Sequence, residues 1–323
     1  MSQVLITTVP FAQLNTYPKD ILEKNNISFT INPLGRKLTE SELCHLARDC
    51  EVIIAGTEPI TEKVFNSAKN LKLISRVGIG LDSVDLLAAR KRNINVSYTP
   101  DAPAPAVAEL TIGLMLSLIR HTHKSNLQLH NGIWNRFFGK RIVDCKIGLI
   151  GLGRIGQKVL NHLQSLGVKN ILYNDILEIE NNDAHYSTKE EIYKSSDIIS
   201  LHLPLTSRTK DLITKKEIGF MNKDAFLINT SRGGIINEKD LSEALSREKI
   251  SGAAIDVFDN EPYDGDLKNF ESCILTSHMG SMSNDCRSQM EIEATNEAVR
   301  FLLEGRQEGA VPEEEYLVQK QGL

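Results

Sequence analysis

The sequence predicts an α/β fold made of two doubly wound, parallel-sheet domains, and three observations lead to this prediction. Short apolar runs alternate with helical patterns along most of the chain. The runs are continuously apolar rather than alternating with polar residues, which is typical of parallel strands that helices cover on both faces. The chain has 323 residues, a length that favours two domains over one.

The first alternation occupies the start of the chain. Helical patterns lie at 39–49 and 83–93. Around them, apolar and β-branched residues predict strands at 4–8, 28–33, 51–56, 71–78 and 94–98.

Residues 99–110 interrupt this pattern because they hold three of the ten prolines. Proline fixes φ and cannot donate a backbone hydrogen bond, so the first part of the stretch is a candidate hinge. One long helix is expected after it, from about Pro105 to Gly132.

A second alternation begins with KIGLI at 146–150. A helix is expected at 237–250 and a last one at 283–305, followed by a polar tail with weak periodicity. The further strands of this half are expected at 170–175, 197–205, 225–233, 251–258 and 273–278.

Composition excludes several classes of protein. The net charge of −5 argues against a general nucleic-acid binder, which needs a basic surface for phosphates. Five cysteines without a C-x-x-C pair favour free thiols in a reducing compartment. The start of the chain lacks the pattern of a secretory signal, and the apolar stretch 106–119 is too short to span a bilayer. A cytoplasmic protein without a membrane partner or a bound metal is therefore expected.

Gly151, Gly153 and Gly156 form a G-x-G-x-x-G motif directly after the strand at 146–150. This spacing is typical of a dinucleotide site, where the glycines allow a tight turn, close approach of the pyrophosphate and close helix packing. The helix that opens at Arg154 offers free N–H groups to the phosphates. The alternative is a glycine-rich turn without a ligand.

Asp175 ends the next strand, at the distance where such sites carry an acidic residue for the ribose hydroxyls. A carboxylate there repels a 2′-phosphate, and Ile176 and Leu177 supply no arginine to receive one. The cofactor is therefore expected to be NAD rather than NADP.

The chain resembles the D-isomer-specific 2-hydroxyacid dehydrogenases, and among them the members similar to phosphoglycerate dehydrogenase. The resemblance runs from about Leu43 to Gly305 and implies a Rossmann NAD domain, residues 100–285, inserted into a flavodoxin-like substrate domain, residues 1–99 and 286–323. The blocks that carry it are RVGIGLDSVDL (76–86), GLIGLGRIG (148–156), HLPLTSRTKDLI (202–213), INTSRGGIINEKDL (228–241), AAIDVFDNEP (253–262) and SHMGS (277–281).

The resemblance implies a catalytic triad of Arg232, Glu261 and His278. The planar guanidinium of Arg232 suits a bidentate grip on a carboxylate. A histidine such as His278 can give a proton in one direction of the reaction and take it in the other. Glu261, for which Asp259 is the rival, would hold the second ring nitrogen and favour the protonated ring. Formate dehydrogenases carry glutamine there, so glutamate speaks against formate.

The resemblance also implies the other contacts. Backbone N–H groups of Gly78, Ile79 and Gly80 would bind the substrate carboxylate. Asp256 would contact the nicotinamide carboxamide, unless it is only a capping carboxylate, and His202 is either structural or adjacent to the nicotinamide. The full set of expected cofactor contacts is Gly151, Gly153, Arg154, Ile155, Gly156, Asp175, His202, Pro204, Thr230, Ser231, Asp256, Gly280 and Ser281.

The sequence gives one indication about the substrate. Gly56 stands where members that act on 3-phosphoglycerate often have an arginine for the phosphate, and Glu58 adds negative charge. A 3-phosphoglycerate dehydrogenase is therefore possible but not preferred, and another cation, either Arg76 or one from a partner subunit, would have to bind the phosphate.

The expected activity is hydride transfer between NAD and a small D-2-hydroxy acid or its 2-oxo acid. Two alternatives stay open, an NAD(H)-sensing protein similar to corepressors of this fold and an enzyme that oxidises phosphite. Adenosylhomocysteinase-like chemistry needs a longer chain and other motifs.

The stretch 130–142 carries the single tryptophan, Trp134, beside Phe137 and Phe138. Aromatic residues and arginine are enriched in interface cores, although burial within one subunit is the alternative. Since members of the family pair through this region, the resemblance implies a two-fold symmetric homodimer formed by the NAD domains.

Overall fold

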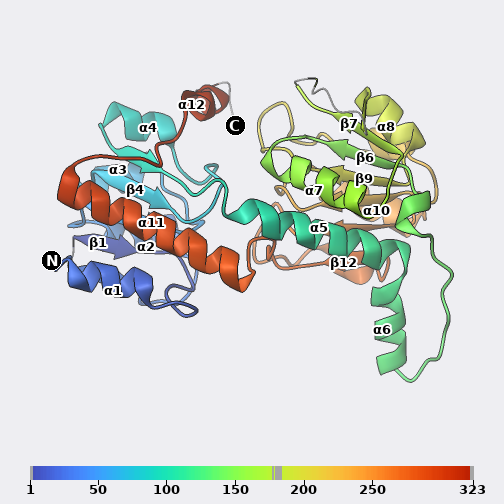
Figure 1. The fold of residues 1–323 in the computed structure, drawn as a ribbon, viewed down its shortest axis with the longest axis horizontal. Coiled ribbons are helices and arrows are strands. Elements are labelled where there is room, and N and C mark those ends of the chain that lie inside the picture. Colours follow the sequence, from blue (N-terminus) through green and yellow to red (C-terminus); the bar gives the residue numbers. More distant parts are fainter. Residues whose placement is uncertain (1–2, 177, 179–183, 321–323) are drawn as a thin grey trace. The chain divides into compact units, whose positions relative to one another are not determined.

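The computed structural model describes residues 3–176, 178 and 184–320. Leu177, considered above beside Asp175, lies outside the described residues, as do residues 1–2 and 321–323 of the expected substrate domain. The chain forms two compact units (Figure 1). The first unit comprises Met1–Pro103 and Ser281–Leu323, and the second comprises Ala104–Gly280.

The first unit contains a parallel sheet with the strand order β2-β1-β3-β4-β5. This is the flavodoxin-like order, and it was predicted. Its continuously buried strands β1, β3 and β4 explain why the sequence shows apolar runs rather than alternation. The strands are β1 (Val4–Ile6), β2 (Phe29–Ile31), β3 (Val52–Ala55), β4 (Leu73–Arg76) and β5 (Asn95–Ser97).

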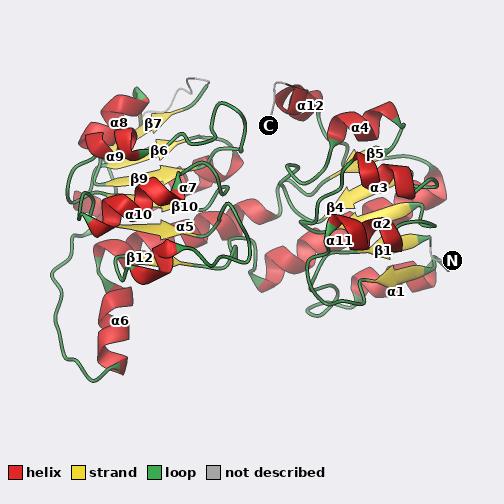
Figure 2. Ribbon diagram, turned by 180° about the vertical axis from the view of Figure 1, so that it is seen from behind, coloured by secondary structure: helices red, strands yellow, loops and turns green. Residues whose placement is uncertain are grey.

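Helices cover both faces of this sheet (Figure 2). Helix α11 packs against α1 and against β3 and β4, while α2, α3 and α4 pack in sequence beside one another. Side chains fix several of these helices at their starts: Thr39 and Glu42 form a capping box on α2. The helices are α1 (Tyr17–Lys24), α2 (Glu40–Leu46), α3 (Glu62–Ser67), α4 (Leu86–Lys91), α11 (Asn284–Glu304) and α12 (Glu313–Lys320).

The second unit contains a seven-stranded parallel sheet with the order β12-β11-β10-β9-β6-β7-β8. This is the predicted Rossmann order, with one further strand at the β12 edge. The strands are β6 (Ile147–Ile150), β7 (Ile171–Asn174), β8 (His185–Tyr186), β9 (Ile198–Leu201), β10 (Phe226–Asn229), β11 (Gly252–Ile255) and β12 (Cys273–Leu275).

The helices of the second unit enclose two apolar clusters, one on each face of the sheet. The unit includes two short 3₁₀ helices, η1 (Ile142–Asp144) and η2 (Asp266–Asn269). The α-helices are α5 (Pro103–Ile119), α6 (Thr122–His130), α7 (Arg154–Ser165), α8 (Lys189–Ser195), α9 (Lys215–Phe220) and α10 (Glu238–Ser246).

The single long helix expected from Pro105 to Gly132 was wrong, because the chain breaks after Ile119 into α5 and α6. His121 has a φ of 53°, a left-handed conformation that ends a helix. The two helices are bent by 67° relative to one another, and α6 and the loop after it extend away from the body of the second unit (Figure 1). In the described part of the chain, no single helix is long and apolar enough to cross a membrane.

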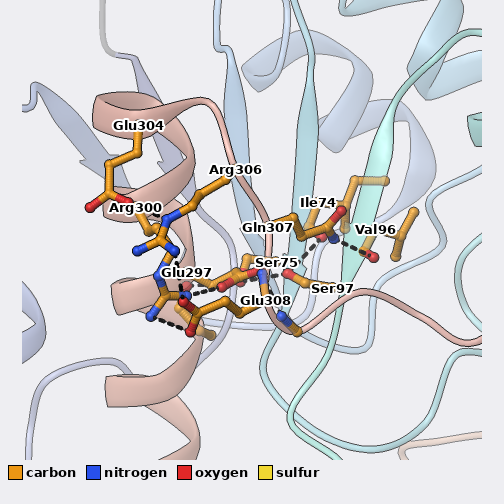
Figure 3. A network of polar contacts seen from close by, with 12 residues as sticks. Ile74, Ser75, Val96, Ser97, Glu297, Arg300, Glu304, Arg306, Gln307 and Glu308 are labelled. Carbon is orange, nitrogen blue, oxygen red and sulfur yellow. Dashed lines mark hydrogen bonds and ion pairs between the residues drawn. The ribbon is translucent and has the colours of Figure 1, made fainter.

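The polar tail after α11 is ordered against the first unit (Figure 3). Glu297 Oε1 accepts hydrogen bonds from the backbone N–H groups of Glu308 and Gly309, at 2.8 and 2.9 Å. The side chain of Gln307 donates to Val96 O at 2.7 Å, and Ala310 forms an antiparallel bridge to Ser97. The tail therefore covers the free edge of β5.

Candidate active site

The glycine motif forms a tight turn between β6 and α7. Gly151 has a φ of 95°, and a Cβ on it would lie 2.2 Å from His202 O. A Cβ on Gly156 would lie 2.3 Å from Gly151 O, so both positions exclude any side chain. Gly153, at the start of α7, has no atom within 4 Å of its Cβ position. The turn thus has two positions where only glycine fits, and it leaves open space over the N-terminus of α7. This arrangement fits a pyrophosphate. Arg154 and Ile155 form the first residues of α7 beside it.

Asp175 lies at the carboxyl end of β7, next to this turn. Its Oδ2 accepts a hydrogen bond from the backbone N–H of Leu152, so the carboxylate is held against the middle of the glycine motif. Ile176, which follows it, exposes 96% of its side chain. Both features fit a site for the adenosine end of a dinucleotide.

His278 and Glu261 are in direct contact. His278 Nδ1 lies 2.9 Å from Glu261 Oε2 and 3.0 Å from Oε1. The histidine has a φ of 50°, and its side chain is 40% exposed. With Nδ1 occupied by the carboxylate, Nε2 is the nitrogen that is available to a reacting molecule.

Asp256 organises the loop that carries His278. This buried carboxylate accepts hydrogen bonds from Thr276 Oγ1 at 2.6 Å and from the N–H groups of Met279 and Gly280 at 2.9 and 3.0 Å. Its backbone oxygen accepts the N–H of His278 at 2.8 Å. These are the contacts of a capping carboxylate, the alternative that the sequence left open, and a contact with the cofactor stays a prediction.

Arg232 follows β10, which lies beside β11 in the sheet. Its Nη1 donates to Ser231 O at 2.6 Å, and Asn229 Nδ2 donates to Arg232 O at 2.8 Å. A Cβ on the next residue, Gly233, would lie 2.1 Å from both C and O of Phe258. The loop of Arg232 therefore rests directly on the backbone that leads to Glu261.

The remaining expected cofactor residues lie at or near the same carboxyl edge. The hydroxyls of Thr230 and Ser231 are engaged internally, with Thr111 Oγ1 and Asn229 Oδ1, both at distances below 3 Å. Pro204 is exposed and its carbonyl accepts a hydrogen bond from Thr209. Ser281 differs from the others, because it belongs to the first unit rather than to the unit that carries the glycine motif.

His202 supports the glycine turn with its backbone. Its Nε2 lies 3.0 Å from Ser200 Oγ, and its Nδ1 is buried without a partner among the described residues. Burial lowers the pKa of His202 to about 4, so the ring is neutral at physiological pH. A structural role, one of the two roles considered for it, agrees with these contacts.

This shift predicts how stability depends on pH. Below pH 6.5 the unfolded chain binds a proton at His202 that the folded protein does not bind until about pH 4. The free energy of unfolding therefore decreases as the pH falls, by about 2 kcal/mol between pH 7 and pH 5. Urea unfolding at both pH values should show this loss in the wild type but not in His202→Gln. The exposed His45→Gln is the control and should keep it, and an equal loss in His202→Gln would refute the assignment.

The first unit corrects one expectation about the substrate carboxylate. Gly78 cannot offer its N–H, because this group donates to Thr99 Oγ1 at 2.8 Å. Thr99 was missed, since nothing in the sequence pairs it with a residue 21 positions earlier. The N–H groups of Ile79 and Gly80 have no acceptor among the described residues, so they remain candidates.

Two other residues of the site were also missed. Thr276 supports Asp256 and stands two residues before His278, so its place in the SHMGS region is the signal that could have found it. Gly233 allows the loop of Arg232 to pack against the backbone of Phe258. The one signal for it in the sequence is its position directly after Arg232.

Comparison with known proteins shows to which family the chain belongs. Residues 112–280 match the model of the D-isomer specific 2-hydroxyacid dehydrogenase NAD-binding domain. The chain belongs to this dehydrogenase family. Its relatives include a hydroxypyruvate reductase of Thermotoga maritima, 31% identical over 90% of this chain and 99% of that protein. Among solved structures, the TT0316 protein of Thermus thermophilus is similar with a TM-score of 0.88 and 31% identity, covering 95% of this chain and 98% of that one.

A D-3-phosphoglycerate dehydrogenase of Methanocaldococcus jannaschii is 38% identical over 77% of this chain. The match covers 49% of that protein, so the chain spans about half the length of this relative. The relatives of this chain therefore differ in length and carry different names.

Proposed function

We propose that the protein catalyses NAD-dependent hydride transfer between a small D-2-hydroxy acid and its 2-oxo acid. The observation that carries this proposal is the contact between His278 and Glu261. A histidine held by a carboxylate through Nδ1 presents Nε2 as an acid or base. NAD(H), when bound at the glycine turn, supplies or accepts the hydride.

The residues of the second unit have distinct tasks in this reaction. Arg232 binds the substrate carboxylate through its planar guanidinium group. His278 Nε2 donates a proton to the carbonyl oxygen during reduction and accepts it from the hydroxyl during oxidation. Glu261 stabilises the protonated ring. The loop that carries His278 is held by hydrogen bonds to Asp256, which fixes the position of the histidine. The names of the relatives, reductases and dehydrogenases of hydroxy acids, favour this reaction over NAD sensing or phosphite oxidation.

The experiment that tests the proposal is NADH oxidation with a panel of 2-oxo acids, among them glyoxylate, hydroxypyruvate and its phosphorylated form. Turnover of at least one of them, dependent on Arg232, is expected. If NADH binds but no 2-oxo acid is reduced, a sensor is the better reading. NAD reduction with phosphite would favour the other alternative. A cytoplasmic location stays a prediction.

Asp175 makes the choice of NAD testable. Its carboxylate should bind the ribose hydroxyls and repel a 2′-phosphate, so wild type should prefer NADH to NADPH by roughly a hundredfold or more in kcat/KM. Asp175→Ala should weaken NADH use and reduce this preference. Steady-state kinetics with both cofactors measure it, with the exposed Asp264→Ala as the control. A wild-type enzyme that prefers NADPH would contradict the role given to Asp175.

We infer that the protein forms a homodimer through α6 and the loop after it. In the isolated chain this segment exposes large apolar side chains: Ile133 is 54% exposed, Trp134 80% and Phe138 99%. Burial within one subunit, the alternative considered above, therefore does not account for Trp134. An apolar patch of this kind on one extended segment favours a partner of the same chain, and the family resemblance supports that choice.

Trp134→Glu should convert the dimer into a monomer, because burying a carboxylate in an interface costs several kcal/mol. Sedimentation at micromolar concentration measures the change. Leu303→Glu, an exposed apolar position in the first unit, is the matched control and should stay dimeric. A monomeric wild type, or a folded Trp134→Glu protein that is still dimeric, would refute the interface.

A further inference from the structure

The loop that carries Glu261 is bound by a second carboxylate, which lies at the start of α10. Glu238 Oε1 accepts a hydrogen bond from the backbone N–H of Asp259 at 2.8 Å. The preceding N–H, that of Phe258, donates to Glu261 Oε1 at 3.2 Å. Two consecutive N–H groups of this loop therefore bind carboxylates, one of Glu261 itself and one of Glu238, 21 positions before Asp259 in the chain.

The contact made by Glu238 is linked to His278 through a short series of hydrogen bonds. Glu261 Oε2 lies 2.9 Å from His278 Nδ1, and Oε1, which accepts from Phe258, lies 3.0 Å from the same nitrogen. The direction of the Glu261 carboxylate thus depends on where residues 258 and 259 lie. The N–H of residue 259 is the one that Glu238 binds.

Other contacts fix the start of α10, so it is a firm support for Glu238. Asn237 caps the helix, since its side chain accepts the N–H of Asp240 at 3.1 Å. Its Nδ2 donates to Asp211 Oδ1 at 3.0 Å, and its backbone N–H donates to Ile213 O at 2.9 Å. Because Asn237 is the cap, the hydrogen bond between Glu238 and Asp259 serves the neighbouring loop rather than the helix.

The surroundings of Glu238 disfavour its charged form. The side chain lines a small cavity together with Gly233, Gly234 and Val257. Burial raises the pKa of Glu238, and the charges of Asp259 and Glu261 raise it further. Solvent would be the more favourable place for this carboxylate, and the hydrogen bond from the Asp259 N–H accounts for its inward position.

We propose that Glu238 is a positioning residue for the general acid: by holding the N–H of Asp259, it keeps the Glu261 carboxylate directed at His278 Nδ1. This proposal rests on the proposed function and deepens it. Glu238 acts through its hydrogen bond rather than its charge, because Asp259 and Glu261 repel a charge at this place. If Glu261 turns away, the ring of His278 is no longer held, and a small displacement of a reacting group lowers the rate strongly.

Three variants separate this role from a role in the stability of the helix. Glu238→Ala removes both the hydrogen bond and the charge. Glu238→Gln removes only the charge, because its amide oxygen can still accept from Asp259. Asp240→Ala is the matched control: Asp240 lies in the same first turn of α10, but its carboxylate accepts the N–H of Lys215, at the start of α9, at 2.9 Å.

Kinetics with a 2-oxo acid that the panel identifies give the first readout. Glu238→Ala should lower kcat by roughly ten- to a hundredfold, while the Kd for NADH, from fluorescence titration, changes by less than about twofold. Glu238→Gln and Asp240→Ala should both stay within about threefold of the wild-type kcat. Thermal unfolding shows whether each variant is folded. If Glu238→Ala is not, Glu238→Asp replaces it, since its shorter side chain keeps the charge but does not reach the N–H.

Nitrogen NMR of the His278 ring measures the positioning without turnover. The ring signals are assigned by their loss in His278→Ala. Glu238→Ala should change the chemical shift of Nδ1, because the hydrogen bond to Glu261 weakens. Glu238→Gln and Asp240→Ala should keep the wild-type shift.

A folded Glu238→Ala protein with the wild-type kcat and the wild-type Nδ1 shift overturns the proposal. So does a Glu238→Gln protein that loses as much activity as Glu238→Ala, or an equal loss in Asp240→Ala. If wild type reduces no 2-oxo acid at all, the proposed function fails, and the Nδ1 shifts of the variants still decide whether Glu238 positions Glu261.

Discussion

Replacing His278 with alanine is expected to lower kcat for 2-oxo acid reduction by about two to four orders of magnitude, as for loss of a general acid. NADH binding should change little, because the glycine turn and Asp175 lie at other strand ends of the same sheet. Steady-state kinetics and NADH fluorescence titration measure the two effects separately. The exposed His185→Ala, in the same unit, is the matched control and should behave as wild type.

Glu261→Gln distinguishes a positioned acid from a histidine that only fills space. The amide can accept a hydrogen bond from Nδ1 but carries no charge, so it should stabilise the protonated ring less. We therefore expect a loss of kcat that is smaller than the loss in His278→Ala but clearly measurable. Near-normal turnover in His278→Ala would remove the assignment of the acid.

Gly233→Ala is the second change with a large expected effect. The added Cβ would lie 2.1 Å from C and O of Phe258 and 2.7 Å from Asp259 N, all of them backbone atoms that cannot rotate away. The loops of Arg232 and Glu261 must then separate. We expect a loss of about 2 to 4 kcal/mol in the free energy of unfolding, comparable to an overpacked core, and a large loss of kcat/KM.

Gly219→Ala is the control, because nothing lies within 4 Å of its Cβ position in α9. It should leave activity unchanged and be neutral or slightly stabilising. Thermal unfolding and kinetics on both variants give the comparison. A Gly233→Ala enzyme with wild-type stability and activity would show that the contact of the two loops is not required.

The sequence predicted both sheets because their strands are buried on both faces and read as continuous apolar runs. It did not predict the break between α5 and α6. The helical pattern continues through Arg120 and His121, and only the left-handed backbone of His121 ends the first helix. Helix α12 was also missed: its position depends on long-range contacts, such as Gln319 Oε1 with the N–H of Leu86 at 2.7 Å.

The sequence predicted one contact of the candidate site and missed others. Glu261 and His278 were paired correctly as neighbours, since both follow strands of one sheet and stand in a recognisable block. The use of the Gly78 N–H by Thr99 could not be predicted, because it depends on the fold bringing together two strand ends. The same holds for Asp256, whose three donors come from a loop about 20 residues later in the chain.

The order of synthesis has different consequences for the two units. Residues 104–280 are continuous, so every strand of the second unit has been synthesised before residue 281 is added. The first unit must wait, because α11 and residues 309–311 complete its packing on β4 and β5. During translation its nascent sheet lacks both the helix that covers one face and the segment that covers the β5 edge. This interval is when the chain most needs protection from edge-to-edge association, and a chaperone that binds apolar strands would act on the first unit.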